Sequence, residues 1–415
     1  MKQTLLSLVL LILALAISFG TLSLFPLTEN PPAPEGSEGE SAPDTSLPEP
    51  KPDIYTVLDI PSAARYPKGD VARCPWDMVV YDGKIYFGSG DYEKNKGPAE
   101  VFCYDPATKS MEKCGTLPDE EVSRFCILDG RLAIPGTDPK EPWSSDTSFS
   151  GSYYLLEGDT WVQKRVLAGA IHNFDLIAYK DRIFAGLGVV PGDSPIAVSL
   201  DGGESFSPVS LYKGDNLVDT AGYELVRTHD FLVCDGKLYA TFYASYPDKT
   251  QSTLYELYQY DEGDASFRFV TSIDGVIDRL AYSHAMIGEK VAFDGKLFFT
   301  TGYLYATEGM TVFEKTLFSD LKIVADLFVE NDTLYLLGSA RDKESGKFRT
   351  AVYQKKAGEK STTLLFDFFY DVPAMSLAVI GDDFYIGMGD GNAANAQNGA
   401  ILLVNLAKGK QELAP

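Results

Sequence analysis

The strongest constraint on the fold is a short phrase that recurs seven times between residues 79 and 386. Each copy has apolar residues, a two-residue turn, a basic or polar residue, an aliphatic residue and usually an aromatic one, as in Val79-Val80-Tyr81-Asp82-Gly83-Lys84-Ile85-Tyr86. The other turns, spaced by 37 to 59 residues, are Asp129-Gly130, Lys180-Asp181, Asp235-Gly236, Asp294-Gly295, Asn331-Asp332 and Gly381-Asp382. Asp-Gly pairs favour the positive φ angles of tight β-hairpins. A period of this length is typical of a repeat architecture.

The residues after each turn predict which strands make up one repeat. The third residue after the start of the turn is apolar in all seven copies, and the next is aromatic in six, with Ala133 the exception. One or two more strand-like runs follow each hairpin, so one repeat is expected to form a four-stranded antiparallel sheet, or blade. Seven blades arranged radially make an all-β, seven-bladed β-propeller, whose closure protects the sheet edges. The run 54–58 is expected to complete the last blade beside residues 401–404; a two-domain β-sandwich is the alternative.

Two segments resemble known propeller families. The run 81–90, followed by 101–108, is similar to a kelch repeat, although Ser89 splits the paired glycines and Met111 stands where a Trp is usual. Separately, Ser199-Leu200-Asp201-Gly202-Gly203-Glu204-Ser205-Phe206 resembles the Asp-box of sialidase-like propellers, with Ser205 and Phe206 replacing the usual Thr and Trp. In that family the Asp-box is a turn between outer strands, so the resemblance implies a structural role.

The first 53 residues have a different composition from the repeats. Leu5 to Phe25 is a run of 21 residues without a charge, preceded by Lys2. This length suits a membrane-spanning anchor, while Ala14-Leu15-Ala16 fits the cleavage site of a signal peptide. Both alternatives place the rest of the chain outside the cytoplasm, either anchored in the membrane or secreted. Residues 26–53 are rich in Pro and Glu and are expected to form a disordered linker, which leaves 54–415 as the propeller domain.

The charge of the chain narrows its possible partners. There are 36 basic and 59 acidic residues, for a net charge of -23. Lys2 contributes +1 and residues 26–53 contribute -6, so residues 54–415 carry -18. Nucleic acid is excluded as a partner, because binding to phosphates needs a positive surface. A monomer is expected, with a membrane contact through the N-terminal segment only.

One position in each repeat predicts a candidate ligand site. Five residues before each turn, where the innermost strand of a blade begins, the sequence has Asp77, Arg124, Asp175, Asp230, Glu289, Asp326 and Ser376. We call these the inner-ring positions. The functional interpretation is a polar ligand site or a cation site at the channel mouth, and oxygen ligands would suit Ca²⁺. The alternative is structural: each carboxylate accepts hydrogen bonds from backbone amides of the next blade.

The segments that lead into the inner strands also concentrate other polar residues. They hold all three histidines, His172, His229 and His284, together with arginines that include Arg227 and Arg279. Loops on a rigid scaffold often carry binding residues. A mixed group of Arg, carboxylate and aromatic side chains would suit a sugar or an acidic glycan. For each histidine the alternative is an ordinary loop or core contact.

These observations favour a non-catalytic, extracytoplasmic module that binds a glycan, peptide or protein ligand at the channel face. The alternative is a carbohydrate-active enzyme, either a sialidase-like hydrolase or a polysaccharide lyase. A sialidase would take its three arginines from Arg124, Arg227 and Arg279, and a lyase could use His229 and Tyr223. The sequence identifies no catalytic residue set, because it has no nucleophile elbow, P-loop or dinucleotide motif. Cys103 and Cys114 could form a disulfide across a hairpin centred near Lys109.

Overall fold

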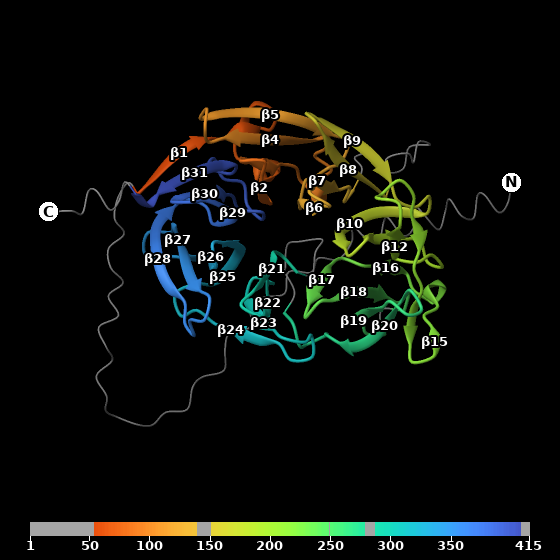
Figure 1. Cartoon of the computed structure of the whole chain (residues 1–415). Coiled ribbons are helices and arrows are strands. Elements are labelled where there is room, and N and C mark those ends of the chain that lie inside the picture. The colour runs from red at the N-terminus through yellow and green to blue at the C-terminus, as the bar shows by residue number, and fades with distance from the viewer. Residues whose placement is uncertain (1–53, 139–150, 249, 279–286, 408–415) are drawn as a thin grey trace, which may run out of the picture. The chain divides into compact units, whose positions relative to one another are not determined.

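The computed structural model describes residues 54–138, 151–248, 250–278 and 287–407, which form an all-β propeller of antiparallel sheets (Figure 1). One four-stranded sheet joins the first described strand to the last three: β1 (Tyr55–Asp59), β31 (Ala400–Asn405), β30 (Asp383–Met388) and β29 (Ala374–Ile380). Tyr55 pairs with Val404, as the sequence predicts. The chain therefore closes the propeller by pairing its beginning with its end.

Four more sheets contain four consecutive strands each. Their strands are β2 (Met78–Tyr81), β3 (Lys84–Gly88), β4 (Ala99–Asp105) and β5 (Ser110–Leu117); β6 (Cys126–Leu128), β7 (Arg131–Pro135), β8 (Ser152–Glu157) and β9 (Thr160–Arg165); β21 (Lys290–Phe293), β22 (Lys296–Thr300), β23 (Leu304–Thr307) and β24 (Glu314–Thr316); β25 (Ile323–Glu330), β26 (Thr333–Arg341), β27 (Phe348–Lys356) and β28 (Thr363–Tyr370). Short 3₁₀ helices lie in connections: η1 (Pro61–Ala64), η2 (Val71–Arg73), η3 (Tyr92–Lys94) and η4 (Thr220–Gly222).

The third and fourth repeats differ from the prediction, because they share one eleven-stranded sheet. Its strands are β10 (Ala170–Tyr179), β11 (Arg182–Val189), β12 (Ile196–Ser199), β13 (Ser207–Pro208), β14 (Leu211–Lys213), β15 (Asn216–Leu217), β16 (Leu225–Arg227), β17 (Phe231–Cys234), β18 (Lys237–Ser245), β19 (Leu254–Asp261) and β20 (Ser266–Ser272). Strand β16 pairs with both β11 and β18, and β14 pairs in parallel with β20. These extra pairings come from the connection between the two repeats, where the sequence has no turn phrase.

The seven predicted turns are all present, and their first residues all have positive φ, between 47° and 61°. At Asp82-Gly83 both residues have positive φ, which matches the twist of the flanking strands β2 and β3. The apolar residue that follows each turn is buried in every repeat: Ile85, Leu132, Ile183, Leu238, Leu297, Leu334 and Phe384. The recurring phrase thus builds the second strand of each repeat, and this strand is packed between neighbouring sheets.

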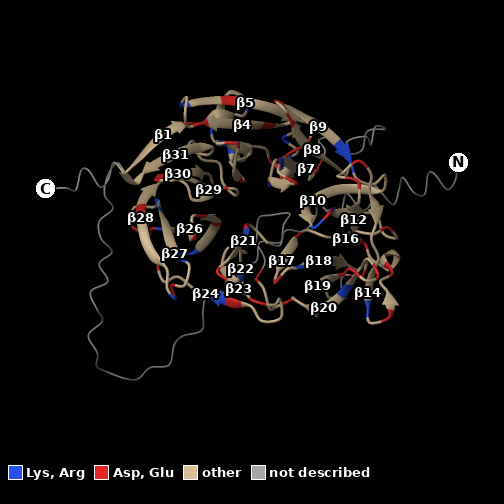
Figure 2. Cartoon of the chain, in the orientation of Figure 1, with Lys and Arg blue, Asp and Glu red and all other residues tan. Residues whose placement is uncertain are grey.

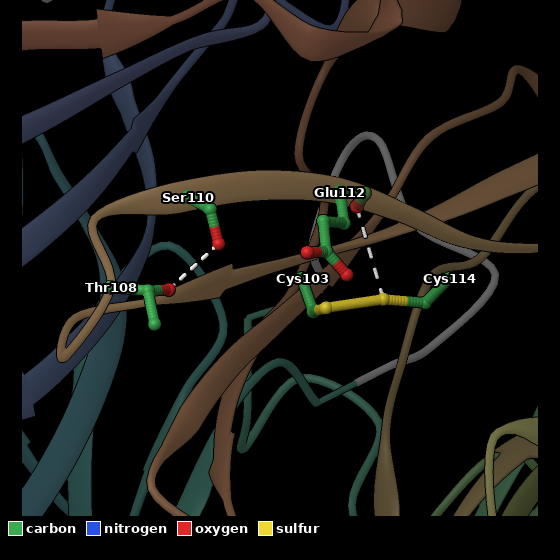
Figure 3. Close-up of a disulfide and its surroundings, with 5 residues drawn as sticks. All are labelled: Cys103, Thr108, Ser110, Glu112 and Cys114. Carbon is green, nitrogen blue, oxygen red and sulfur yellow. Dashed lines mark hydrogen bonds between the residues drawn. A yellow bond between two sulfur atoms is a disulfide. The ribbon is translucent and has the colours of Figure 1, made fainter.

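Cys103 on β4 and Cys114 on β5 form a disulfide, with Cα atoms 6.1 Å apart (Figure 3). The two residues are not directly opposite, because Cys103 pairs with Glu112 and the register shifts between Val101 and Phe102. The shift leaves Cys114 as the extra residue of a bulge, on the same side as Cys103. Such a bond is typical of proteins exposed to an oxidising compartment.

The N-terminal anchor or signal peptide (1–25) and the linker (26–53) lie outside the described residues, so the structure does not test them. In the part of the chain that the structure describes, no helix is long and apolar enough to cross a membrane. Acidic residues occur on the outer strands and loops as well as toward the centre of the domain (Figure 2). The negative charge of the domain is therefore not confined to the inner ring.

Candidate functional site

The inner-ring positions lie on or immediately before the innermost strand of each repeat, as the sequence predicts. Asp77 precedes β2 and Arg124 lies two residues before β6, whereas Asp175, Asp326 and Ser376 lie within β10, β25 and β29. Each innermost strand from β6 to β29 contacts the next one around the centre of the domain, and β29 contacts β2 (Figure 1). The count from the turns therefore identified one structural layer.

Most carboxylates of this layer bind the backbone of the next repeat. Oδ2 of Asp77 accepts a hydrogen bond from the Phe125 N–H at 2.6 Å, and Oδ2 of Asp175 accepts one from Phe231 at 2.7 Å. In the same way Asp230 accepts from Ile287 at 3.2 Å, and Asp326 accepts from Leu377. Ser376 completes the circuit by donating to the Pro75 carbonyl at 2.8 Å. These are the contacts expected of the structural alternative.

Arg124 binds the inner-ring carboxylate of the next repeat and also reaches the one beyond it. Its guanidinium lies 3.2 Å from the Asp175 carboxylate and 3.0 Å from the Asp230 carboxylate, and it donates to the Ile287 carbonyl at 2.8 Å. Lys290, at the start of β21, also pairs with Asp175. Sequence counting missed Lys290, because it follows an inner-ring position by one residue. The two cations thus neutralise Asp175 and Asp230 and leave the other three carboxylates without an opposite charge in contact.

A cavity of about 200 Å³ lies beside this uncompensated part of the ring. Four inner-ring residues line this central cavity: Asp77, Arg124, Glu289 and Asp326. The position just before the inner ring lines it in six of seven repeats, with Trp76, Ser123, Phe174, Gly288, Ala325 and Met375. Sequence reasoning missed five of these residues, all but Trp76, although a count of six back from each turn would have found them.

Successive residues of a regular strand point to opposite faces, so two adjacent residues would not both be expected to line the cavity. β-Bulges explain why they do. The pairing register shifts between Asn173 and Asp175 in β10, between Val324 and Asp326 in β25, and between Ala374 and Ser376 in β29. The extra residues at these shifts are Phe174, Ala325 and Met375, and all three line the cavity. A bulge re-aims a side chain without ending the sheet, which is why bulges are common beside binding sites.

The charge environment divides the ring into two groups of carboxyl groups. Burial, and then Glu289, raise the pKa of Asp77 to about 7, and burial together with Glu289 and Asp77 holds the pKa of Asp326 well above its ordinary value. Burial also raises the pKa of Glu289. At Asp175 burial acts in the same sense, but Lys290 and Arg124 outweigh it, so its pKa is lowered. Burial outweighs Arg124 at Asp230, whose pKa is raised, so Asp175 is the one inner-ring carboxyl group of the five whose pKa is lowered by its cations.

The predicted His and Arg residues form a second layer behind the cavity wall, around Phe174. His172 stacks on Phe174 with centroids 5.2 Å apart, His229 meets it edge-on at 4.7 Å, and the Arg227 guanidinium lies 5.4 Å from its ring centroid. His172 Nδ1 donates to the Thr137 carbonyl at 2.8 Å, and burial followed by Arg227 lowers its pKa to about 3. This histidine is neutral at physiological pH. His284 and Arg279 lie outside the described residues.

The two residues suggested for a lyase lie in different aromatic clusters. Tyr223 packs against Tyr246 with centroids 5.0 Å apart, and burial raises its pKa to about 12. Besides Phe174, His229 packs against Tyr243 at 5.6 Å. Neither Tyr223 nor His229 lines the central cavity.

A second acidic group, which the sequence analysis did not find, lies next to the cavity between the sheets of β2–β5 and β6–β9. It consists of Asp91, Asp119, Glu120, Glu121 and Asp138. Glu120 is only 2% exposed, and its side chain has no hydrogen-bond or ion-pair partner among the described residues. Burial, and then Asp138 and Asp119, raise its pKa to about 9. Glu121 lines the cavity, and burial raises its pKa to about 8.

The arrangement of these carboxylates does not favour the Ca²⁺ expectation. In the described ranges, no group of three or more His, Cys, Asp or Glu is placed to hold a metal ion. The inner-ring carboxylates instead point their oxygens at backbone amides of the adjoining repeat.

The turn at 199–206 connects β12 to β13 and is closed by its own side chains. Asp201 accepts hydrogen bonds from the Ser205 N–H at 2.9 Å and the Ser205 hydroxyl at 2.6 Å, and these bonds lower its pKa to about 2. Tyr153 of the preceding sheet donates to the Gly203 carbonyl at 3.1 Å. The turn thus connects two outer strands and ties them to β8, and none of its residues lines the cavity.

Comparison with known proteins identifies a shared fold only. No protein-family model matches the chain, and no curated protein matches it. Among solved structures, it is similar to the β-propeller domain of the Trilobed protease from Pyrococcus furiosus, with 18% identity, 69% of this chain and 78% of that chain covered, and a TM-score of 0.37.

Two further structures are similar at lower identity. BamB from Moraxella catarrhalis is 13% identical, with 79% of this chain and 82% of that chain covered and a TM-score of 0.38. Polysaccharide lyase Uly1 is 11% identical, with 84% of this chain and 95% of that chain covered and a TM-score of 0.41. One fold hosts many activities, so these similarities assign none to this chain.

Proposed function

We propose that the chain is an extracytoplasmic binding module whose ligand, a glycan, peptide or protein, enters the central cavity. The observation that carries this proposal is that the cavity wall is built from the same position in successive repeats. Six of the seven repeats contribute the same position to it, and three of those positions are placed by β-bulges. A concave site of mixed apolar and polar lining on a rigid scaffold is the usual form of a ligand site.

We further propose that the domain has seven blades, in kelch-like repeats with one turn of the Asp-box type. The eleven-stranded sheet contains two runs in the order of ordinary blades, β10 to β13 and β17 to β20, joined through β16. Counting these runs separately makes seven, in agreement with the seven turn phrases. The hydrogen-bonded turn at Asp201 lies between outer strands, which suits the structural role implied by the resemblance.

The location outside the cytoplasm is part of the proposal and is supported by two features. The Cys103–Cys114 disulfide is stable in an oxidising compartment. The apolar run from Leu5 to Phe25 provides the export signal and, if uncleaved, the membrane tether.

Catalysis is the weaker alternative, because the described arginines are engaged elsewhere. A sialidase needs three arginines converging on one carboxylate. Arg124 is occupied by Asp175 and Asp230, and Arg227 lies over Phe174. Tyr223 and His229, the lyase pair, do not line the cavity. We therefore base the proposal on binding.

The experiment is a screen of the full chain on glycan and peptide arrays, repeated with a variant that fills the cavity mouth. Asn392 lines the cavity and is exposed, so Asn392→Trp should remove binding of any captured ligand. Ala394 is exposed on the same loop but does not line the cavity, which makes Ala394→Trp the matched control. Equal binding by both variants would place the ligand elsewhere and overturn the proposal.

A further inference from the structure

Negative charge on the cavity wall is not matched by positive charge. Asp77, Glu289 and Asp326 face the cavity from three repeats, and the repeat of Ser376 lies between those of Asp326 and Asp77. Among the described residues that line it, Arg124 is the only basic one, and its guanidinium is paired with Asp175 and Asp230. Lys290 is paired with Asp175 as well. Like charges in a low-dielectric site repel one another unless a cation or a proton relieves them.

The hydrogen bonds of these carboxylates leave acceptor capacity for a ligand. Asp326, 5% exposed, binds two backbone amides, and Asp77 binds the amide of Phe125. The Glu289 carboxylate accepts a hydrogen bond from the backbone N–H of Lys290. Glu121, 6% exposed and also on the cavity wall, accepts one bond, at Oε2 from the Tyr92 N–H at 3.3 Å. An ionised carboxylate can accept about four hydrogen bonds, so Glu289 and Glu121 are under-used.

Much of the rest of the wall is apolar, although Ser123, Thr137, Asp390 and Asn392 also line it. Trp76, Phe174, Met375 and Pro373 line the cavity together with Val324. The Trp76 indole is held in place, because its Nε1 donates to the Gly90 carbonyl at 2.8 Å. An aromatic ring beside carboxylates also attracts a cation through its electron-rich face.

We propose that the central cavity binds a small organic cation, a protonated primary amine on an apolar body. The ammonium group lies among Asp77, Glu289 and Asp326, and the apolar body packs against Trp76 and Met375. This inference rests on the proposed binding function and names its ligand class. An ammonium group offers three donors, which suits three carboxylates with free acceptor positions. An acidic glycan, by contrast, would meet three carboxylates and an arginine that is already paired.

Binding should release protons, which a merely apolar pocket would not do. The pKa of Asp77 is raised to about 7, and those of Glu289 and Asp326 are raised as well. The other charged groups that act on these three are Arg124, Lys290 and Asp175. A bound ammonium favours the ionised carboxylates, so protons leave as the amine enters at neutral pH.

The test is calorimetric titration of the full chain at pH 7 with phenethylammonium chloride, and with 2-phenylethanol as its neutral counterpart. We expect the amine to bind at least tenfold more tightly than the alcohol. Its binding enthalpy should differ between phosphate and HEPES buffers, since released protons are taken up by the buffer. Equal affinity for the alcohol, or binding without proton release, would overturn the inference. So would displacement of the amine by millimolar CaCl₂, because that result would indicate a metal site.

The variant Glu289→Gln separates binding from folding. Loss of its charge relieves repulsion with Asp77 and Asp326, so the melting temperature should rise while amine affinity falls at least tenfold. Glu157, exposed at the end of β8, provides the control Glu157→Gln, which should change neither quantity. Unchanged amine affinity in Glu289→Gln would contradict the inference.

The outcome is distinguishable from failure of the proposed function. If the amine does not bind but an array ligand is captured and is lost in Asn392→Trp, the cavity is a ligand site for another chemical class. If neither the amine nor any array ligand binds, both proposals fall.

Discussion

At the scale of single residues, the inner ring shows how one repeated position serves two purposes. Asp77 and Asp326 use part of their acceptor capacity to hold the neighbouring repeat and still face the cavity. Asp175 and Asp230 have lost the second purpose, because Arg124 and Lys290 neutralise them. An Asp at an inner-ring position therefore predicts a hydrogen bond to the next blade. Whether its carboxylate can also bind a ligand depends on whether a cation of the protein is already paired with it.

Arg124 is the residue on which this division depends most, and its replacement should be costly. Arg124→Met would leave Asp175 and Asp230 buried without their shared counter-charge, which we expect to lower the free energy of unfolding by about 3–5 kcal/mol. Denaturant unfolding followed by fluorescence measures the change. Arg341→Met is the control, because Arg341 is exposed at the end of β26 and should change stability by less than about 0.5 kcal/mol. Similar stability of the two variants would refute the bridging role of Arg124.

At the scale of elements, the tight turns carry most of the information that specifies the repeats. All seven have a first residue in the left-handed region, although only one of these is Gly. Asp and Asn tolerate this region better than other residues, and Gly usually follows. The apolar residue that follows each turn is then buried, so one short phrase sets the turn, the register and a core position together.

The glycine at the second turn position offers a direct check. A Cβ at Gly295, or at Gly309, would meet no atom within 4 Å, but only Gly295 has φ in the left-handed range, at +78°. Gly295→Ala should therefore destabilise the domain by about 1–2 kcal/mol through backbone strain alone. Gly309→Ala should be neutral within about 0.5 kcal/mol. Thermal unfolding of the two variants compares them, and equal melting temperatures would mean that the turn conformation contributes little.

At the scale of the whole molecule, buried carboxyl groups with raised pKa values should make the domain more stable in mild acid than in base. The pKa is about 7 for Asp77, Asp119 and Asp138, about 8 for Glu121 and about 9 for Glu120. A carboxyl whose folded pKa lies above its unfolded value contributes stability below the unfolded pKa, near 4. That contribution is lost as pH rises through the folded pKa, here between about pH 4 and pH 9.

Groups with lowered pKa values act in the opposite direction at the acid end, and His172 and Asp175 are two buried examples. The pKa of His172 is lowered from 6.5 to about 3, so its contribution is lost as pH falls below 6.5. Asp175, with a lowered pKa, loses its contribution only as pH falls below about 4. Five carboxyl groups outweigh one imidazole above about pH 4, so the optimum lies in mild acid, at about pH 4 to 5.

Melting temperatures at pH 5, 7 and 9 measure this dependence, and we expect a fall at each step. Glu120→Gln should have the same stability as the parent at pH 5, where Glu120 is protonated. At pH 9 its free energy of unfolding should exceed that of the parent by at least about 1 kcal/mol, the free energy of a one-unit pKa shift. Glu112→Gln, on the exposed side of β5, should follow the parent at every pH. A melting temperature that rises from pH 5 to pH 9 would contradict this account of the acidic group.

By itself, the sequence determined the architecture: an all-β propeller, the pairing of residues 55–57 with 402–404, the turns, and the inner-ring layer. These features follow from local rules. The alternation of apolar and polar residues and the residue types of the turns recur in every repeat, so agreement among seven copies supports the prediction for each copy. The Cys103–Cys114 bond was open to prediction for the same reason, since both cysteines belong to one hairpin.

Only the tertiary structure decided which residues share a site. The bulges that turn Phe174, Ala325 and Met375 toward the cavity leave no mark in the turn phrase, because a bulge is one extra residue between two correctly paired ends. The pairing of Arg124 with Asp230, 106 residues away, and the gathering of acids around Glu120 depend on how blades meet. Charge compensation acts through space and not along the chain, so the open side of the ring is a property of the folded domain alone.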